Sequence, residues 1–183
     1  MAFHDSAFNN PNEIQNCGTY YPYRIKDDGG NLIRNPKFDN FSGLILDFKE
    51  GKTNIIDAFF HSINSQIKDD IAIAYVPSHD PEKLNSGPKM LAVKLASHGS
   101  RIDATSCLTR HTKIVKLANG GSRSKEVHLN SLSASNIHLI KNRTVLIIDD
   151  VTTSNNSLLA CQEILLKSGA KSVHCLALAQ TEG

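Results

Sequence analysis

The sequence is poor in the residues and patterns that mark secreted, metal-stapled or membrane-spanning proteins. Its four cysteines are scattered along 183 residues without a CxxC spacing, which argues against a zinc site or a disulfide framework and fits a reducing compartment. The longest strongly apolar run, IAIAYV at 71–76, is too short to cross a bilayer. The opening residues MAFHDSAFNNPNE lack the basic and apolar regions of an export signal. We therefore expect a soluble, cytoplasmic protein.

A large excess of charge of either sign is also absent. Lys and Arg number 20 and Asp and Glu number 18, for a formal net charge of +2, so no overall field attracts nucleic acid or a membrane surface. We expect neither as a partner. A chain of 183 residues is long enough to bury one substantial core. We predict an N-terminal extension over residues 1–41, followed by one α/β domain over residues 42–183.

What the sequence does contain is an alternation of strand and helix patterns from residue 43 to the end. Five apolar runs are predicted strands: 43–48, 71–76, 101–105, 144–148 and 172–179. Three intervals show helical spacing: 53–67 with Thr53 or Asn54 as its cap, 88–99 ending at Gly99, and 157–168 ending before Gly169. This order is typical of a parallel sheet covered by helices on both faces. We therefore predict an α/β fold with a doubly wound central parallel sheet of about five strands.

Two stretches do not follow that alternation. The N-terminal 41 residues contain the turn signal Asp28-Gly29-Gly30 between polar and aromatic segments, which predicts a hairpin and a small hood on the sheet. Residues 107–136 are polar and basic with weak periodicity, which predicts a long mobile loop.

Two adjacent carboxylates follow the predicted strand at 144–148. Asp149 and Asp150 precede a run of small polar residues, which leads into a helix. The crevice beyond the carboxyl ends of parallel strands is where ligands bind, and the free N–H groups of a helix N-terminus attract an anion. The segment thus offers acceptors for hydroxyl groups beside a cradle for a phosphate, and a sugar phosphate has both groups.

The stretch VLIIDDVTTSNNSL at 145–158 resembles the ribose-5-phosphate-binding signature of type I phosphoribosyltransferases. The order of elements from residue 43 onward is similar as well, and the long basic segment and short C-terminus most resemble the competence-protein-F-like branch. The resemblance implies transfer of ribose 5-phosphate from phosphoribosyl pyrophosphate to a nitrogenous acceptor, a base or an amine, with release of pyrophosphate. It also implies Mg²⁺ as the cofactor and a homodimeric enzyme.

The resemblance assigns roles to individual residues. It implies that Asp149 and Asp150 hold the ribose 2- and 3-hydroxyls, and that Pro77, Ser78 and His79 face the diphosphate and its Mg²⁺. The implied phosphate contacts are Thr152, Thr153, Ser154, Asn155, Asn156 and Ser157. Residues 107–128 occupy the place of the flexible catalytic loop, with the candidate cations Arg110, Lys113, Lys116, Arg123 and Lys125. No side chain is assigned as a metal ligand.

The sequence departs from the family pattern at three points. Asn155 stands where the phosphate loop usually has glycine; asparagine tolerates a left-handed backbone but adds a side chain. Thr153 stands where some purine-specific members carry an acidic general base, which a hydroxyl does not replace near neutral pH. The branch's N-terminal zinc-binding cysteines are missing, since Cys17 is the only cysteine in that region.

Other functions fit parts of the same sequence. A non-catalytic protein of the same fold, which binds phosphoribosyl pyrophosphate or another nucleotide as a signal or assists DNA uptake, stays open. The letters EGKT at 50–53 suggest a P-loop-like NTPase, but that pattern requires glycine where Leu46 lies. A phosphoacceptor receiver domain carries its acidic pair after its first strand, whereas only 33 residues follow Asp150 here.

Overall fold

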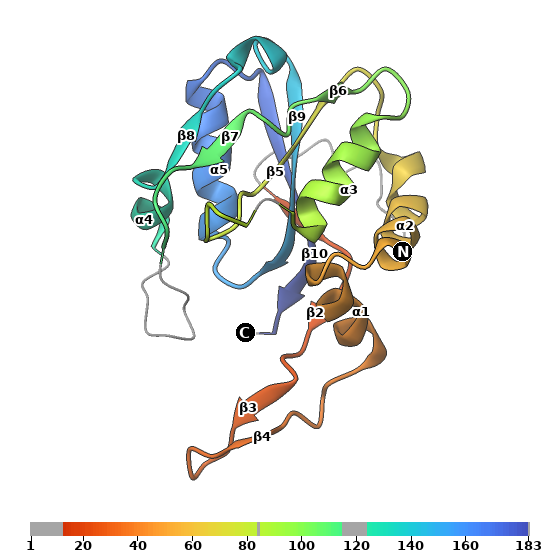
Figure 1. Ribbon diagram of the computed structural model, residues 1–183, viewed down its shortest axis with the longest axis vertical. Coiled ribbons are helices and arrows are strands. Elements are labelled where there is room, and N and C mark those ends of the chain that lie inside the picture. The colour runs from red at the N-terminus through yellow and green to blue at the C-terminus, as the bar shows by residue number, and fades with distance from the viewer. Residues whose placement is uncertain (1–12, 84, 115–123, 183) are drawn as a thin grey trace.

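The computed structural model describes residues 13–83, 85–114 and 124–182 (Figure 1). Its centre is a six-stranded sheet in the order β1-β10-β9-β5-β6, with β2 also beside β10. These strands are β1 Ile14–Asn16, β2 Thr19–Tyr20, β5 Ala72–Tyr75, β6 Ile102–Asp103, β9 Thr144–Thr152 and β10 Ser172–Thr181. All their pairings are parallel. The prediction of a central parallel sheet is confirmed.

Successive side chains of β9 point to opposite faces of the sheet, and both faces are buried. Val145 and Ile147 belong to one hydrophobic cluster, whereas Leu146 and Ile148 belong to a second. The first cluster is completed by α5, Asn156–Lys167, and the second by α1, Asn40–Lys49, α2, Thr53–Ile63, and α3, Gly87–Ala96. Figure 1 shows α5 on one side of the sheet and α2 and α3 on the other. The sheet is therefore doubly wound, as predicted.

The predicted helices at 53–67, 88–99 and 157–168 correspond to α2, α3 and α5. The cap predicted for the first is wrong, because α2 begins at Thr53 after Lys52, and no side chain caps it. Two 3-10 turns complete the helical segments, η2 Asn64–Gln66 and η4 Ile137–Leu139. Within the described residues, no helix is long and apolar enough to cross a membrane.

The segment 43–48 is helical, so the strand predicted there is wrong. It lies within α1, whose N-terminus is capped by the Asp39 side chain accepting from the Ser42 N–H at 2.7 Å. Ile45 and Phe48 point into the core at helical spacing, while Leu44 faces solvent. When a short stretch is almost entirely apolar, its periodicity fits a strand and a helix equally well.

Residues 107–136 are more ordered than the predicted mobile loop. Strands β7, Leu108–Arg110, and β8, Leu132–Ala134, pair in antiparallel fashion, and α4 spans Lys125–Leu129. Leu108 and Leu132 are buried against the sheet. The loop prediction is therefore wrong for these parts, whereas residues 115–123 lie outside the described chain.

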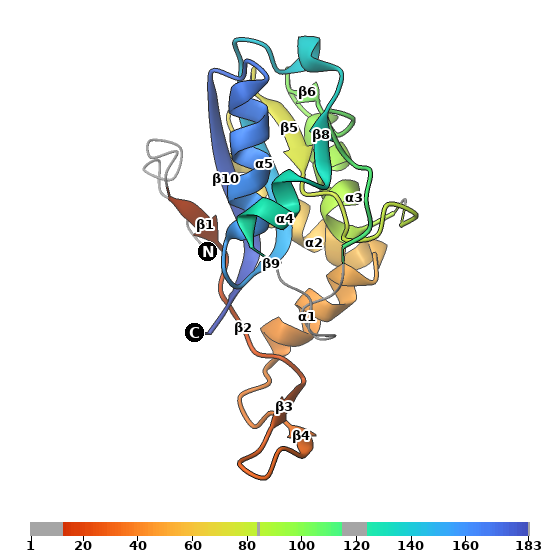
Figure 2. The ribbon, with the colours of Figure 1, turned by 90° about the vertical axis from the view of Figure 1, so that its left-hand side faces the viewer.

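The N-terminal region contributes both a hairpin and part of the sheet. Strands β3, Arg24–Lys26, and β4, Leu32–Arg34, form the hairpin predicted around Asp28-Gly29-Gly30, and Gly30 takes the positive φ of +80° that its turn requires. Figure 2 shows this hairpin projecting from the body. In contrast, β1 and β2 pair with β10. A domain boundary after residue 41 stays a prediction.

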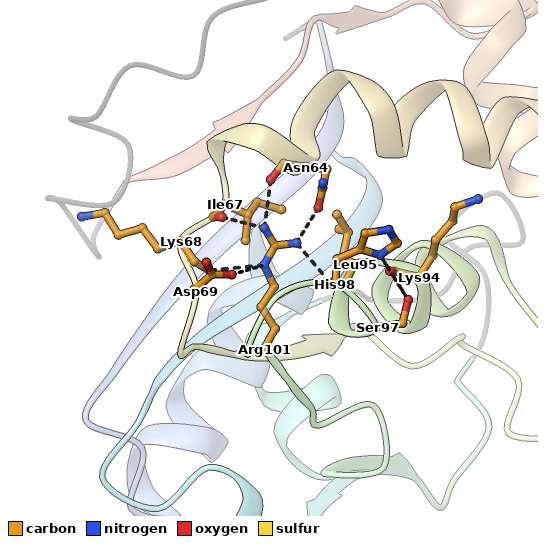
Figure 3. Close-up of polar contacts among 9 residues, drawn as sticks. All are labelled: Asn64, Ile67, Lys68, Asp69, Lys94, Leu95, Ser97, His98 and Arg101. Carbon is orange, nitrogen blue, oxygen red and sulfur yellow. Dashed lines mark hydrogen bonds and ion pairs between the residues drawn. The ribbon is translucent and has the colours of Figure 1, made fainter.

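A buried arginine holds the other edge of the sheet together (Figure 3). The Arg101 side chain is 5% exposed and precedes β6. Its guanidinium donates to the carbonyls of Asn64, Ile67 and Leu95 at 2.9, 2.7 and 3.1 Å. It also donates to the Lys68 carbonyl and to the Asn64 side chain. Because these acceptors lie after α2 and in α3, one side chain fixes both helices where β5 and β6 begin.

Candidate functional site

The paired carboxylates lie in the last part of β9, and the strand runs on to Thr152. The Asp149 side chain is buried: its Oδ2 accepts from Ser157 Oγ of α5 at 3.2 Å, and its Oδ1 accepts from the Asp150 N–H at 2.9 Å. Asp150 is only partly buried, and its own Oδ1 accepts from the Val151 N–H at 2.6 Å. One carboxyl is thus fixed inside the fold, and the other lies beside solvent.

Burial, followed by the nearby charge of Asp150, raises the pKa of Asp149 to about 8. The neutral form of the Asp149 carboxyl is therefore favoured far more strongly than that of an exposed carboxyl.

Helix α1 brings a cation to this pair. Lys49, the last residue of α1, has its Nζ 3.9 Å from Asp150 Oδ1 and 5.1 Å from the centre of the Tyr20 ring. Burial, with the charge of Asp150 second, raises the pKa of Tyr20. Lys49 is not among the predicted site residues, because the preceding residues are predicted as a strand. The helix places its last turn near β9 through packing that the local pattern does not contain.

Residues of the predicted phosphate loop form hydrogen bonds with one another. Asn155 has φ +62°, in the left-handed region, and is the cap residue of α5, although it makes no side-chain cap hydrogen bond. Thr152 Oγ1 donates to Asn155 Oδ1 at 2.8 Å and accepts from the Asn155 N–H at 3.1 Å. Thr153 and Thr181 hydroxyls lie 2.9 Å apart, which ties the loop to β10. The expectation that asparagine tolerates the left-handed position is confirmed.

The predicted diphosphate loop lies beside the carboxylates because β5 and β9 are neighbours. Tyr75 pairs with Ile148, and the Val76 N–H donates to the Ile148 carbonyl at 2.9 Å. The chain then enters residues 77–80 at the same edge of the sheet as Asp149 and Asp150. The structure thus brings residues 77–79, 149–150 and 152–157 to one edge.

The candidate cations of 107–128 are engaged with the protein. Arg110 is buried in β7, so its assignment to a flexible loop is wrong. Lys113 pairs with Asp80, and Lys125 pairs with Glu163 of α5 at 2.6 Å. Lys116 and Arg123 lie outside the described residues.

Across residues 13–83, 85–114 and 124–182, no group of three or more His, Cys, Asp or Glu side chains is placed to hold a metal ion. The carboxyls at this edge of the sheet include Asp80 as well as Asp149 and Asp150. Asp80 pairs with Lys113, Asp149 is buried, and Asp150 is partly exposed.

The geometry thus defines an α/β domain in which the acidic pair 149–150, the hydroxyl-rich start of α5 and residues 77–80 meet at the carboxyl edge of a parallel sheet. The phosphoribosyl transferase domain family matches residues 90–182, about half of the chain, and this range contains β9, the phosphate loop and α5. The chain belongs to this family. None of the curated proteins compared with the chain matches it.

Three solved structures show related arrangements at low identity. The allosteric regulatory enzyme of purine biosynthesis is 16% identical, with a TM-score of 0.48, over 86% of this chain and 36% of that one. A purine phosphoribosyltransferase from Pyrococcus horikoshii is 18% identical, with a TM-score of 0.35, over 68% and 69%. A hypoxanthine phosphoribosyltransferase from Staphylococcus aureus is 14% identical, with a TM-score of 0.39, over 76% and 68%. The chain spans about a third of the length of the first.

Proposed function

We propose that the chain is a phosphoribosyltransferase. It would transfer ribose 5-phosphate from phosphoribosyl pyrophosphate to a nitrogenous acceptor, a base or an amine, and release pyrophosphate. Membership of the family supports this proposal. The observation that carries it is the meeting, at one edge of the sheet, of the carboxyl pair 149–150, the hydroxyl-rich start of α5 and the backbone of 77–79.

The reaction explains why these groups lie together. The bond from ribose C1 to the pyrophosphate oxygen breaks, the oxygen keeps the electron pair, C1 bonds to the acceptor nitrogen, and that nitrogen releases its proton to water. Positive charge develops on the sugar, so a carboxylate beside the ring stabilises the transition state. Asp150, partly exposed and adjacent to the helix start, is placed to accept from the ribose hydroxyls, and Asp149 fixes its position.

The residues present fit Mg²⁺ as a cofactor that arrives with the donor. Mg²⁺ in phosphate-transferring sites is held by substrate phosphates, water and one or two carboxylates, and Asp150 with the hydroxyl of Ser78 supplies protein oxygens at the sheet edge. When bound, Mg²⁺ neutralises charge on the leaving diphosphate.

A non-catalytic binder of the same ligand is the second candidate function. It is favoured by the engagement of Arg110, Lys113 and Lys125 with other parts of the protein, since each of these three cations already has a partner within the chain. Asn155, which replaces the usual glycine of the phosphate loop, also favours a non-catalytic binder. Turnover of phosphoribosyl pyrophosphate, measured beside its binding, separates the two functions.

The finer assignments rest on the resemblance of the sequence. They are membership of the competence-protein-F-like branch, assembly into a homodimer and a cytoplasmic location. The resemblance does not identify the acceptor, because the N-terminal region, which would select it, lies outside the matched residues.

Calorimetry tests the proposal. We expect phosphoribosyl pyrophosphate with Mg²⁺ to bind the unmodified chain, and we expect Asp150→Asn to weaken binding at least about tenfold, because a charged acceptor of two ribose hydroxyls is lost. Asp28→Asn, at an exposed carboxyl in the β3–β4 turn, is the matched control and should bind normally. Equal affinities for the unmodified chain and Asp150→Asn would reject the assigned role.

A further inference from the structure

The buried guanidinium of Arg110 joins two segments of the predicted site. The residue is 4% exposed. Its Nε donates to the Ser78 carbonyl at 2.6 Å and its Nη2 to the Pro77 carbonyl at 3.3 Å. On its other side, Nη1 donates to Ser131 Oγ, and Nη2 lies 3.4 Å from His128 Nδ1. Arg110 therefore connects the loop after β5 with the α4–β8 segment.

The residues after Arg110 also bind the loop that follows β5. The Ile114 N–H donates to the His79 carbonyl at 3.1 Å, and the Lys113 ammonium pairs with Asp80. Each residue from 77 to 80 is thus bound by a group from 110–114. An arginine suits this place because its planar fork satisfies two carbonyls at once, which a lysine ammonium does less well.

These contacts determine which way the peptide groups of the loop point. The described chain has no cis peptide bond, and in a trans peptide the N–H points opposite to the C=O of the same plane. Because the carbonyls of residues 77–79 face 110–114, the N–H groups of residues 78–80 face away from it. The Asp80 N–H is directed at Ser78 Oγ, 3.3 Å away. Successive N–H groups on one side of a loop form an anion-binding concavity.

We propose that Arg110 is a positioning residue for the diphosphate end of the donor. It holds the carbonyls of Pro77 and Ser78 behind the loop, so that the N–H groups of residues 78 and 79 are presented to the diphosphate. Its buried positive charge lies behind the same loop and adds to the attraction for an anion. This inference rests on the proposed function, because it assigns the diphosphate to this loop.

A matched pair of substitutions tests the inference. Arg110→Lys keeps the charge but loses the fork, and Arg101→Lys makes the same change in the other buried arginine that binds backbone carbonyls. Titrations use inorganic pyrophosphate with Mg²⁺ and, separately, ribose 5-phosphate. For Arg110→Lys we expect pyrophosphate affinity to fall at least about tenfold, while ribose 5-phosphate affinity stays within about twofold. For Arg101→Lys we expect both affinities to be retained despite a lower melting temperature.

The outcomes separate this inference from the proposed function. Unchanged pyrophosphate affinity in Arg110→Lys, or an equal loss for both ligands in both variants, would overturn the role of Arg110 alone. Failure of the unmodified chain to bind either ligand would overturn the proposed function and this inference together. Amide hydrogen exchange of the unmodified chain gives a test that does not depend on the folding of a variant. Pyrophosphate, and not ribose 5-phosphate, should slow exchange at residues 78–80, and the absence of that difference would contradict the inference.

Discussion

At the scale of single residues, the site is governed by the unequal surroundings of two adjacent carboxyls. Asp149 is closed in by β9 and α5, whereas Asp150 lies near Lys49 and solvent. The sequence predicts both residues because an acidic pair after a buried strand is a recognisable pattern. It does not predict that the pKa of one of them is raised, since this depends on burial by residues far away in the chain.

The raised pKa of Asp149 makes stability depend on pH. The unfolded chain loses this proton near its ordinary value of 3.8 and the folded chain near 8, so between these values the folded state binds more protons. The contribution of the Asp149 proton to the free energy of unfolding is therefore complete at low pH. It is lost as the pH rises through the folded pKa, by at most about 1.4 kcal/mol per pH unit. We expect Asp149→Asn to flatten this fall, as measured by urea unfolding from pH 5 to pH 8. A parallel fall in both proteins would contradict the buried, protonated state, and Asp28→Asn should behave like the unmodified chain.

The left-handed backbone of Asn155 yields a second prediction. Asn155→Ala should destabilise the chain by about 1–2 kcal/mol, because alanine takes that conformation at a cost. Asn155→Gly removes the conformational cost but also the hydrogen bond to Thr152, so it should stay within about 1 kcal/mol of the unmodified chain. Urea unfolding of the two variants checks the order. If alanine is the better tolerated of the two, the loop does not have this conformation.

At the scale of elements, the β3–β4 hairpin, four strands of the sheet and three helices were predictable, whereas α1, β7 and β8 were not. The runs 71–76, 144–148 and 172–179 are buried on both faces in a parallel sheet, so their composition alone identifies them. In contrast, α1 is helical because Asp39 caps it and Phe48 packs into the core. Neither the cap nor this packing can be seen in a local apolar pattern. Strands β7 and β8 are three residues each and depend on pairing with each other.

The contact between α1 and α3 can be tested at one glycine. A Cβ on Gly87 would lie 2.2 Å from the Phe48 carbonyl oxygen and 2.7 Å from its ring. Gly87→Ala must therefore separate the start of α3 from the end of α1, and we expect a loss of about 1–3 kcal/mol in urea unfolding.

Gly43 of α1 provides the control for this substitution. An added Cβ there would meet nothing closer than Phe38 at 3.9 Å. Gly43→Ala should leave stability unchanged or raise it by up to about 1 kcal/mol, since alanine is the better helix former. Equal effects at the two glycines would contradict the packing of α3 on α1.

At the scale of the whole molecule, the site is assembled from segments far apart in the chain. Lys49 arrives from the N-terminal region, residues 77–80 follow β5, Arg110 supports them from β7, and β9 with α5 supplies the carboxyls and the phosphate loop. Only the last of these is a contiguous sequence motif. The others meet through the sheet order. Lys49 was therefore not predicted as a site residue, and Arg110 was predicted as a cation of a flexible loop, not as a buried support of residues 77–80.

The projecting hairpin is separable from this assembly. Replacing residues 24–34 by a short Gly-Ser linker removes β3 and β4, which pair with each other. Because such a surface hairpin adds little burial to the body, we expect the free energy of unfolding to change by less than about 1 kcal/mol and ribose 5-phosphate binding to persist. Loss of cooperative unfolding in circular dichroism would show instead that the hairpin is part of the core.

The central claim is that one pocket holds a pentose by its hydroxyls and its phosphate. A crystal structure of the chain with ribose 5-phosphate tests it most directly. The account predicts the phosphate oxygens on the N–H groups of residues 153–157 and the ribose hydroxyls on Asp150, which Asp149 holds in place. A phosphate bound at another edge of the sheet, or hydroxyls that make no contact with Asp150, would contradict it.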